Sequence, residues 1–450
     1  MPRLYSALLT ILTPLALARL WWKGRANPAY RERWKERLGH IPDLPARPRL
    51  WVHAVSVGET IAAAPLVRSW MTRHPDWAVL VTTTTPTGSA QVRRLFGDTV
   101  EHVYLPYDLP GAVRRFFGHA HPTLGIVMET ELWPHLFAEA GARSMPLVLA
   151  NARLSERSMR GYAKVGGLVR STLRHLSLIA ARGPDDAERF IELGAHTGNV
   201  EAVGNLKFDL DLPPEVRERG QGWRSAVGAD RPVWIAASTH PGEEEVVLEA
   251  HRAILAIHPD ALLLLAPRHP ERANEIARMI ESQGFGLVRR STLAPSPSPF
   301  ALPSLLLPAS MPETPSNCGH REPKGMGGGS QSVFMIDTLG ELMDFYAASD
   351  VAFVGGSLVA HGGHNPLEPA ALGLPVLTGP HVFNFTEIYD AMLPTGAARK
   401  VANAEALAAT LAELLGDAGC RQTMGATGRA WMATHRGALG RLIERMEALL

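Results

Sequence analysis

Short apolar runs alternate with helical patterns through most of this 450-residue chain. In the first half, the apolar runs occupy residues 50–55, 78–83, 102–105, 124–128, 147–150, 178–181 and 200–203. Strand-length apolar runs separated by turns and helices are typical of parallel strands joined by crossover helices. The pattern therefore predicts an α/β domain built on a parallel sheet over residues 26–208.

A second series of the same kind begins at residue 232. Its apolar runs cover residues 232–237, 261–266, 286–289, 333–336, 351–354 and 375–377. The most economical architecture is a pair of doubly wound, Rossmann-like domains that face each other across a cleft, with ligands at the carboxyl ends of the strands. The second domain is predicted over residues 230–425, and residues 426–450 are predicted to form a closing helix.

Two segments interrupt the alternation. Residues 209–229 are polar and contain Pro213-Pro214, which favours a linker between the domains. Residues 293–331 are rich in Pro, Ser and Gly, which indicates a flexible surface insertion without catalytic residues.

The first 25 residues differ from the rest of the chain. Residues 4–22 are apolar apart from Tyr5, Ser6, Thr10, Thr13 and Arg19, and they end in two tryptophans followed by a basic stretch. A full membrane crossing needs about 20 apolar residues, so this segment is marginal as a span. The tryptophans and the basic flank favour a membrane anchor facing an anionic cytoplasmic leaflet. A buried amphipathic helix is the alternative.

Composition limits the other classes of partner. The formal net charge of +1 provides no general field for nucleic acid, so none is expected as a partner. The two cysteines, Cys318 and Cys420, have neither metal-site spacing nor a disulfide framework, which fits a reducing cytoplasm. Nothing in the sequence indicates an oligomeric state.

The most informative motif covers residues 353–370, which read FVGGSLVAHGGHNPLEPA. A strand ends in a glycine-rich turn, and a helix then starts near Asn365-Pro366 with Glu368 in its first turn. Such a turn brings backbone N–H groups close to a ligand, and a helix N-terminus favours an anion. Glu368 suits the hydroxyls of a sugar or ribose diol. The motif predicts the donor pocket of a nucleotide-sugar glycosyltransferase, although an ordinary βα turn with a capping acid has the same pattern.

The first strand leads into Ser56, Gly58 and Glu59, and Ser56 and Gly58 are predicted to contact the acceptor. Gly58 permits a tight turn, and Glu59 at the start of the next helix can accept a proton from an attacking hydroxyl. An acid that complements the helix dipole is the alternative. The next strand ends in a loop with Thr87, Gly88 and Ser89, which either binds an acceptor phosphate or sugar or caps a helix.

Three later strand ends of the first half carry charged residues. Glu129 and Glu131 follow a strongly apolar strand, and at least one is expected to point toward the ligand side. Arg153 can meet an anionic group and is predicted to bind the acceptor. Lys207, the last cation before the polar segment, is placed to neutralise a leaving group, although a solvated surface lysine is an equal alternative.

In the second half, Pro267-Arg268 ends a strand, and the Arg268 fork can bond two phosphate oxygens at once; an ion pair with a nearby acid is the alternative. Leu339, Gly340 and Glu341 form another strand-end turn. His361, His364 and His381 have no convincing metal-ligand spacing, so neither a metal nor another cofactor is expected.

The order of these motifs resembles the 3-deoxy-D-manno-octulosonic acid (Kdo) transferases of lipid A assembly. The similarity covers nearly the whole chain and rests on the words HAVSVGE (53–59), YLPYDL (104–109), METELWP (128–134), ANARLS (150–155), LKFD (206–209), PRHPER (267–272) and residues 355–368. Only residues 293–331 depart from the family pattern.

This resemblance implies a GT-B fold and a metal-independent, inverting transfer from CMP-Kdo to a hydroxyl of the tetraacyl lipid A precursor at the cytoplasmic face of the inner membrane. Glu59 corresponds to the general base, and Glu129 and Lys207 to the residues that stabilise the transition state. The CMP-binding segments would be Pro267 and Arg268, Leu339 to Glu341, and the stretch Asn365, Pro366, Leu367 and Glu368.

Two other readings remain open. A different GT-B enzyme, such as a UDP-sugar transferase or epimerase, shares the fold and the glycine loop. A membrane-tethered sugar-binding protein without activity would have no need for Glu59.

Overall fold

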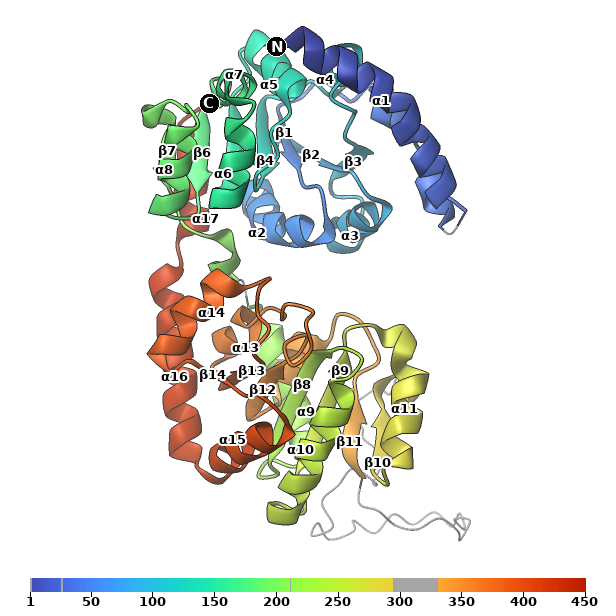
Figure 1. The fold of residues 1–450 in the computed structure, drawn as a ribbon, viewed down its shortest axis with the longest axis vertical. Helices are drawn as coiled ribbons and strands as arrows, with labels where there is room; N and C mark the ends of the chain where they lie inside the picture. Colours follow the sequence, from blue (N-terminus) through green and yellow to red (C-terminus); the bar gives the residue numbers. More distant parts are fainter. Residues whose placement is uncertain (1, 26, 211, 294–330) are drawn as a thin grey trace. The chain divides into compact units, whose positions relative to one another are not determined.

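The computed structural model describes residues 2–25, 27–210, 212–293 and 331–450. The chain forms two compact units, shown with their elements in Figure 1. The first unit comprises Met1–Asp209 and His435–Leu450, and the second comprises Leu210–Thr434. Each unit contains a seven-stranded parallel sheet, so the α/β class and the GT-B type of fold are confirmed.

The sheet of the first unit has the strand order β3-β2-β1-β4-β5-β6-β7. Its strands are β1 (Arg49–His53), β2 (Ala78–Thr83), β3 (Glu101–Tyr104), β4 (Leu124–Met128), β5 (Leu147–Ala152), β6 (Leu178–Ala181) and β7 (Val200–Ala202). The strand order reverses between β1 and β4. The carboxyl ends of the strands at such a reversal are where ligands of open α/β sheets bind.

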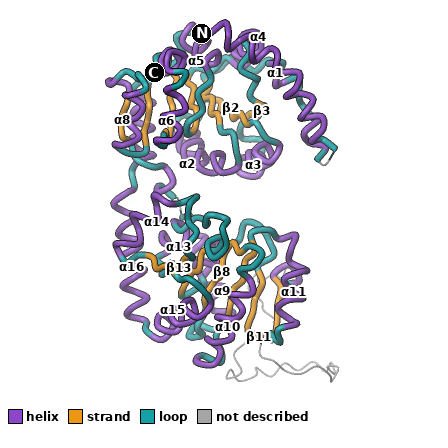
Figure 2. Tube along the Cα trace, viewed as in Figure 1, coloured by secondary structure: helices purple, strands orange, loops and turns teal. Residues whose placement is uncertain are grey.

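Helices cover both faces of this sheet, as the purple and orange tubes of Figure 2 show. One core contains apolar residues of α2 (Val57–Arg73), α3 (Pro86–Phe96) and α17 (Ala438–Glu447), and the other contains those of α4 (Pro110–Ala120), α5 (Pro134–Ala142), α7 (Gly166–Leu173) and α8 (Pro184–Glu192). The remaining helices are α6 (Glu156–Ala163) and the 3-10 turns η1 (Pro28–Arg31), η2 (Glu36–Leu38), η3 (Thr197–Asn199) and η4 (Leu206–Phe208).

The first unit begins with α1 (Pro2–Lys23), whose large apolar side chains are mostly exposed, including Ile11 at 69% and Leu15 at 65%. Near its start, the Tyr5 hydroxyl donates to Asp108 Oδ2 at 2.9 Å. Residues Leu4–Lys23 are, within the described ranges, the one helix long and apolar enough to cross a membrane. The alternative of a buried amphipathic helix is wrong, because among the described residues none of this apolar stretch is buried.

The sheet of the second unit has the strand order β10-β11-β9-β8-β12-β13-β14. Its strands are β8 (Val233–Thr239), β9 (Leu262–Pro267), β10 (Gly286–Arg289), β11 (Gln331–Met335), β12 (Val351–Val354), β13 (Val376–Thr378) and β14 (Ala398–Lys400). Its helices are α9 (Pro214–Val227), α10 (Glu244–Ile257), α11 (Ala273–Ser282), α12 (Leu342–Ala347), α13 (Leu367–Leu372), α14 (Thr386–Met392), α15 (Ala404–Gly416) and α16 (Ala418–His435), with the turns η5 (Pro270–Arg272), η6 (Arg290–Thr292) and η8 (Leu393–Thr395). Here the order reverses between β8 and β12.

The predicted linker over residues 209–229 is wrong for most of its length. Residues Pro214–Val227 form α9, and its buried Val216, Trp223 and Val227 lie in one core of the second unit. Apolar residues at this helical spacing bury one face of a helix that is otherwise largely polar, and Pro214 is favoured at a first helical position.

The predicted closing helix over residues 426–450 is two helices, α16 and α17. The helical conformation is interrupted between them at Gly437, whose φ of 94° favours glycine. Asp209 then caps α17, because its carboxylate accepts hydrogen bonds from the N–H groups of Gly437 at 2.6 Å and Leu439 at 2.7 Å. Of the insertion predicted over residues 293–331, residues 294–330 lie outside the described residues.

Candidate active site

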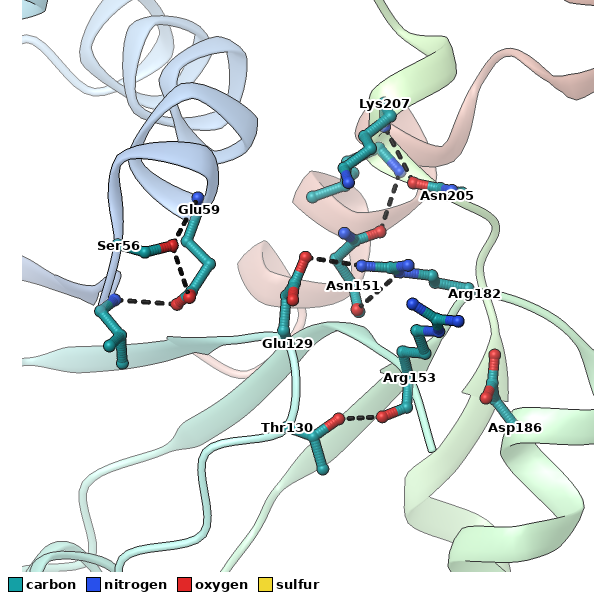
Figure 3. A network of polar contacts seen from close by, with 12 residues as sticks. Ser56, Glu59, Glu129, Thr130, Asn151, Arg153, Arg182, Asp186, Asn205 and Lys207 are labelled. Carbon is teal, nitrogen blue, oxygen red and sulfur yellow. Dashed lines mark hydrogen bonds and ion pairs between the residues drawn. The ribbon is translucent and has the colours of Figure 1, made fainter. Parts of the chain in front are cut away.

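Polar side chains follow five neighbouring strands of the first unit, and Figure 3 shows them from close by. Glu59 follows β1, Glu129 follows β4, Arg153 follows β5, Arg182 follows β6 and Lys207 follows β7. Because the carboxyl ends of parallel strands meet at one edge of a sheet, residues that are 148 positions apart in the chain gather in one place.

Glu59 lies in the first turn of α2 and is bound to its own helix terminus. Ser56 is the N-cap, its hydroxyl donates to Glu59 Oε1 at 2.9 Å, and the Val55 N–H donates to Glu59 Oε2 at 2.8 Å. Burial raises the pKa of Glu59, and the Glu129 carboxylate acts in the same direction, while the hydrogen bonds and Lys207 oppose the shift. The carboxylate therefore ties the start of the helix to the segment before it, and it is held in place with lone pairs left to accept a proton.

Glu129 pairs with an arginine that the sequence analysis did not single out. Its carboxylate accepts a hydrogen bond from Arg182 Nη2 at 2.6 Å, and the Arg182 side chain is only 8% exposed. The backbone φ of Glu129 is +57°, a conformation that costs a residue with a Cβ about 1–2 kcal/mol. Such strain at the end of a buried strand aims the carboxylate at a fixed point and is frequent at functional sites.

Glu131 is the third carboxyl in this group. Burial, together with repulsion from Glu59 and Glu129, raises its pKa to about 7. Neighbouring carboxyl groups with different pKa values can hold and release protons at neutral pH. That at least one of Glu129 and Glu131 points toward the ligand side stays a prediction.

Asn151 connects the strand ends to Lys207. Its φ is +54°, its Oδ1 accepts the N–H of Leu206 at 3.1 Å, and its backbone carbonyl accepts Arg182 Nε at 3.2 Å. The turn with Lys207 is also capped by Asn205, whose Oδ1 accepts the Lys207 N–H at 3.1 Å. Lys207 is thus held on an ordered turn, and its positive charge acts to lower the pKa of Glu59.

Arg153 is exposed and lines a hollow of about 280 Å3 together with Thr130, Ser155, Ser158 and Tyr162. The Thr130 hydroxyl donates to the Arg153 carbonyl. This hollow has the polar lining that an anionic or hydroxylated group requires, and Arg153 stays a predicted acceptor-binding residue.

The threonine-rich loop after β2 acts as a helix cap. Thr85 is the N-cap of α3, and its hydroxyl accepts the Gly88 N–H at 3.1 Å. Thr87 is exposed, whereas Gly88 and Ser89 are buried. The assignment of Thr87, Gly88 and Ser89 to the acceptor stays a prediction.

Gly58 does not form the special turn that was expected of it. It lies in the first turn of α2, and a Cβ added there would meet nothing closer than Ser56 Oγ at 3.9 Å. The proposed contact of Ser56 and Gly58 with the acceptor therefore rests on their place beside Glu59.

In the second unit, the first part of the glycine-rich loop after β12 does not offer its N–H groups to a phosphate as predicted. The N–H groups of Gly356, Ser357 and Leu358 all donate to the buried carboxylate of Glu243, at 2.6–2.8 Å. An internal anion thus occupies the place where a ligand anion was expected, and this part of the interpretation is wrong.

Side chains around this loop can bind an anion instead. Arg268 is exposed at the end of β9, and within the described ranges its guanidinium makes no hydrogen bond or ion pair. The alternative of an ion pair with a nearby acid is therefore wrong. Nearby, His240 Nε2 and His364 Nε2 lie 2.8 Å apart, and His361 stacks on His240 with ring centroids 4.1 Å apart. Burial lowers the pKa of both His240 and His364 to about 4, so the pair is neutral at pH 7.

The remaining predicted donor residues lie on two turns. Leu339 is 67% exposed, Gly340 has a φ of 94°, and Glu341 accepts hydrogen bonds from Arg290 Nη2 at 2.7 Å and from Thr338. At the start of α13, Asn365 Oδ1 accepts the Leu367 N–H at 3.1 Å, and Asn365 Nδ2 donates to Glu368 at 3.3 Å.

Burial raises the pKa of Glu368. Pro366 and Leu367 are buried. The described part of the chain contains no cluster of three His, Cys, Asp or Glu side chains arranged for a metal ion.

A family model described as 3-deoxy-D-manno-octulosonic-acid transferase (kdotransferase) matches residues 32–210, and one described as glycosyl transferases group 1 matches residues 328–431. The 3-deoxy-D-manno-octulosonic acid transferase of Haemophilus influenzae is 40% identical to this chain, over 99% of this chain and 98% of that protein. The chain belongs to the Kdo transferase family. The Kdo transferase of Bordetella pertussis is 36% identical, over 98% of each chain.

Solved structures confirm the fold of this Kdo transferase. UDP-GlcNAc 2-epimerase from Neisseria meningitidis, bound to UDP-GlcNAc, matches 88% of this chain and 98% of its own, with 13% identity and a TM-score of 0.55. The fold is therefore shared well beyond the family. The chemistry must be argued from the residues at the strand ends.

Two residues of this Kdo transferase that contact the predicted site segments, Arg182 and Glu243, were not predicted from the sequence. Arg182 follows a strand and precedes Gly183-Pro184, a pattern that signals a strand-end turn and could have been noticed. Glu243 stands in a run of three glutamates, and only the fold separates it from its exposed neighbour Glu245.

Proposed function

We propose that this Kdo transferase moves Kdo from CMP-Kdo to a hydroxyl of the tetraacyl lipid A precursor, lipid IVA, with inversion at the anomeric carbon and without a metal ion. The first unit binds the acceptor and the second binds the donor. In the reaction, the acceptor O–H proton passes to Glu59, the acceptor oxygen bonds to the anomeric carbon, and the bond from that carbon to the phosphate oxygen breaks, so that CMP leaves.

The observation that carries this proposal is the environment of Glu59. Its carboxyl is half-buried with a raised pKa and held by two hydrogen bonds, beside the Glu129–Arg182 pair. A general base must be held in one geometry and must have a pKa closer to neutrality than a free glutamate. Glu129 and Lys207 are assigned to stabilising charge in the transition state.

The donor assignment is supported by side-chain charge in the second unit. CMP carries one phosphate, and a single exposed guanidinium such as that of Arg268 can bond two of its oxygens. Pro267, Leu339 to Glu341 and Asn365 to Glu368 are assigned to the rest of CMP-Kdo. In CMP-Kdo this phosphate is a diester with one negative charge, which one arginine can balance, so a metal ion is not required to hold it.

The acceptor is a lipid, and α1 is the element that fits its location. We propose that α1 attaches the enzyme to the cytoplasmic face of the inner membrane, where the exposed apolar residues enter the lipid and the basic residues after Trp22 meet anionic headgroups.

A transfer assay tests the reaction. Purified enzyme is given CMP-Kdo generated in situ and radiolabelled lipid IVA, and EDTA or a divalent ion is added once CMP-Kdo has formed. The wild-type enzyme should produce a slower-migrating Kdo-lipid in EDTA, and Glu59→Gln should lower kcat by about 10²–10⁴-fold, because it removes the proton acceptor. The number of product bands gives the number of Kdo units transferred.

Because Glu59 is also a first-turn acid of α2, the assay needs a control for the loss of a first-turn carboxylate. Asp185→Asn removes another first-turn carboxylate, at α8, whose side chain is 84% exposed, and it should leave the rate unchanged. A Glu59→Gln enzyme with wild-type kcat would refute the base assignment. Activity that disappears in EDTA and returns with a divalent ion would refute metal independence.

A further inference from the structure

The carboxylate of Glu243 is completely buried and is saturated with backbone donors. Oε2 accepts the N–H groups of His240 at 3.0 Å and Gly356 at 2.6 Å, and Oε1 accepts those of Ser357 and Leu358, both at 2.8 Å. Two carboxylate oxygens offer about four lone-pair sites, so all are used. This carboxylate has no capacity left to touch a ligand.

These four bonds join two loops that are 113 residues apart in sequence. His240 belongs to the loop after β8, and the other three donors belong to the glycine-rich loop after β12, so Glu243 bridges the strand reversal of this sheet. Hydrogen bonds between a carboxylate and backbone N–H groups are charge-assisted and roughly twice as strong as neutral ones. The bridge is therefore a rigid connection.

The connection extends from Glu243 to the predicted donor segment through Gly356. The Gly356 carbonyl accepts the Gly363 N–H at 2.7 Å, and a Cβ added to Gly356 would lie 2.8 Å from the ring of His364. His364 in turn contacts His240 at 2.8 Å, and Asn365 follows it in the chain. A change at Glu243 thus reaches the donor segment by two routes, one through each loop.

Ser357 connects a third strand end to the same point. Its hydroxyl accepts the N–H of Gly379 at 2.8 Å, and its carbonyl accepts that of His381 at 2.9 Å. A Cβ on Gly379 would lie 2.2 Å from the Ser357 carbonyl oxygen, so the loop after β13 packs directly on the glycine-rich loop. The ordered conformation of all three loops therefore depends on the Glu243 carboxylate that lies between them.

We propose that Glu243 is a positioning residue for the donor: its buried carboxylate takes the place of a bound anion inside the glycine-rich loop and so holds the His240–His364 pair and the segment from Asn365 to Glu368 in the geometry that binds the sugar nucleotide. The inference rests on the proposed role of the second unit as the donor-binding unit. It also explains why this glycine-rich loop does not present free N–H groups to a phosphate.

The test compares Glu243→Gln with Glu245→Gln in the full-length enzyme. Glutamine has nearly the same shape, but its amide nitrogen is a donor and cannot accept two of the backbone N–H groups, so the loop should loosen. For Glu243→Gln we expect the KM for CMP-Kdo to rise at least tenfold, with the KM for lipid IVA within twofold of wild type. Glu245 is the exposed neighbour with the same charge, and Glu245→Gln should match wild type in both constants.

Hydrogen exchange of the ligand-free enzyme gives an independent measurement. The amides of residues 356–358 should exchange at least tenfold faster in Glu243→Gln and at the wild-type rate in Glu245→Gln. This comparison needs no substrate. If the wild-type enzyme neither binds CMP nor transfers Kdo, the proposed function fails, and the exchange rates still decide whether Glu243 orders the loop.

A purely structural role predicts a different result. Loss of folded protein lowers the apparent kcat and leaves the KM of the remaining folded enzyme unchanged, and this result would overturn the proposal. A donor KM and a loop exchange rate within twofold of wild type would overturn it as well. If Glu243→Gln does not fold, Glu243→Asp replaces it, because aspartate keeps the charge and is one methylene shorter. Its donor KM should still rise, and an unchanged KM in that variant would also overturn the proposal.

Discussion

His251 lies in the core of the second unit with both ring nitrogens engaged. Trp234 Nε1 donates to His251 Nδ1 at 3.2 Å, so His251 Nε2 carries the proton and donates to the Ser332 carbonyl at 2.9 Å. Protonation of Nδ1 would set two N–H groups against each other inside an apolar core. Burial, with a smaller contribution from Arg231, lowers the pKa of His251 to about 3.

This pKa predicts how stability depends on pH. His251 is protonated near pH 6.5 in the unfolded chain and only near pH 3 in the folded enzyme. The stability contributed by its neutral ring is therefore complete above pH 6.5 and is lost as the pH falls toward 3. We expect this one group to lower the free energy of unfolding by about 2 kcal/mol between pH 6.5 and 5. Urea unfolding at both pH values should give a shallower pH dependence for His251→Gln than for wild type.

An exposed histidine provides the control for this prediction. His40 lies on the surface, so His40→Gln should keep the wild-type pH dependence. Equal pH dependence in wild type and His251→Gln would mean that the ring is not held neutral by its surroundings.

At the scale of single residues, the sequence predicted the positions that follow strands and not their partners. Glu59 could be placed at a helix start because Ser56 and the preceding strand define that start locally. The partners of Glu129 and Glu243 depend on strand order, which brings together residues 53 and 113 positions apart. The predicted anion site in the glycine-rich loop is wrong for this reason, because no local signal shows that Glu243 fills the loop.

At the scale of elements, α9 shows how a polar composition can hide a packed helix. Gly220 of α9 lies against α12, where an added Cβ would be 2.3 Å from the Cβ of Ala347. The two helices approach closely only because position 220 has no side chain. Polar residues and prolines favour a linker here, but the helical spacing of Val216, Trp223 and Val227 decides the structure.

This packing predicts opposite effects for two Gly→Ala substitutions in helices. Gly220→Ala should lower the free energy of unfolding by about 1–3 kcal/mol, because the new methyl group overlaps Ala347. Gly440→Ala in α17 meets nothing within 4 Å and should raise stability by about 0.5–1 kcal/mol, because alanine is the better helix former. Urea unfolding of both variants is the measurement, and an unchanged or stabilised Gly220→Ala protein would show that α9 is not packed in this way.

At the scale of the whole molecule, the alternation of strands and helices was enough to predict two parallel sheets. It did not give the strand order of the second sheet, in which β11 lies between β9 and β10. The sequence separates β10 from β11 by the long insertion, so their pairing is not a local property. The N-terminal helix was predicted from composition alone, and its place outside both cores agrees with its apolar and exposed surface.

That exposed surface leads to the prediction for the whole enzyme. Leu8, Ile11 and Leu15 lie on α1 with exposed fractions of 53%, 69% and 65%, and each buried leucine-sized side chain contributes about 1.5–3 kcal/mol to transfer out of water. Replacing all three with glutamine should lower binding to anionic phospholipid vesicles at least tenfold in a flotation assay. The basic residues after α1 remain in this variant, so its residual binding should be weaker at high salt than at low salt.

A single exposed apolar residue elsewhere separates membrane binding from general surface hydrophobicity. Ile257 at the end of α10 is 60% exposed, and Ile257→Gln should float with the vesicles as wild type does. With soluble, detergent-dispersed lipid IVA, the α1 variant should keep the wild-type kcat, because Glu59 and Arg268 are untouched. With lipid IVA embedded in vesicles, its rate should fall in parallel with its binding. Equal flotation of the α1 variant and wild type would place membrane attachment elsewhere in the chain.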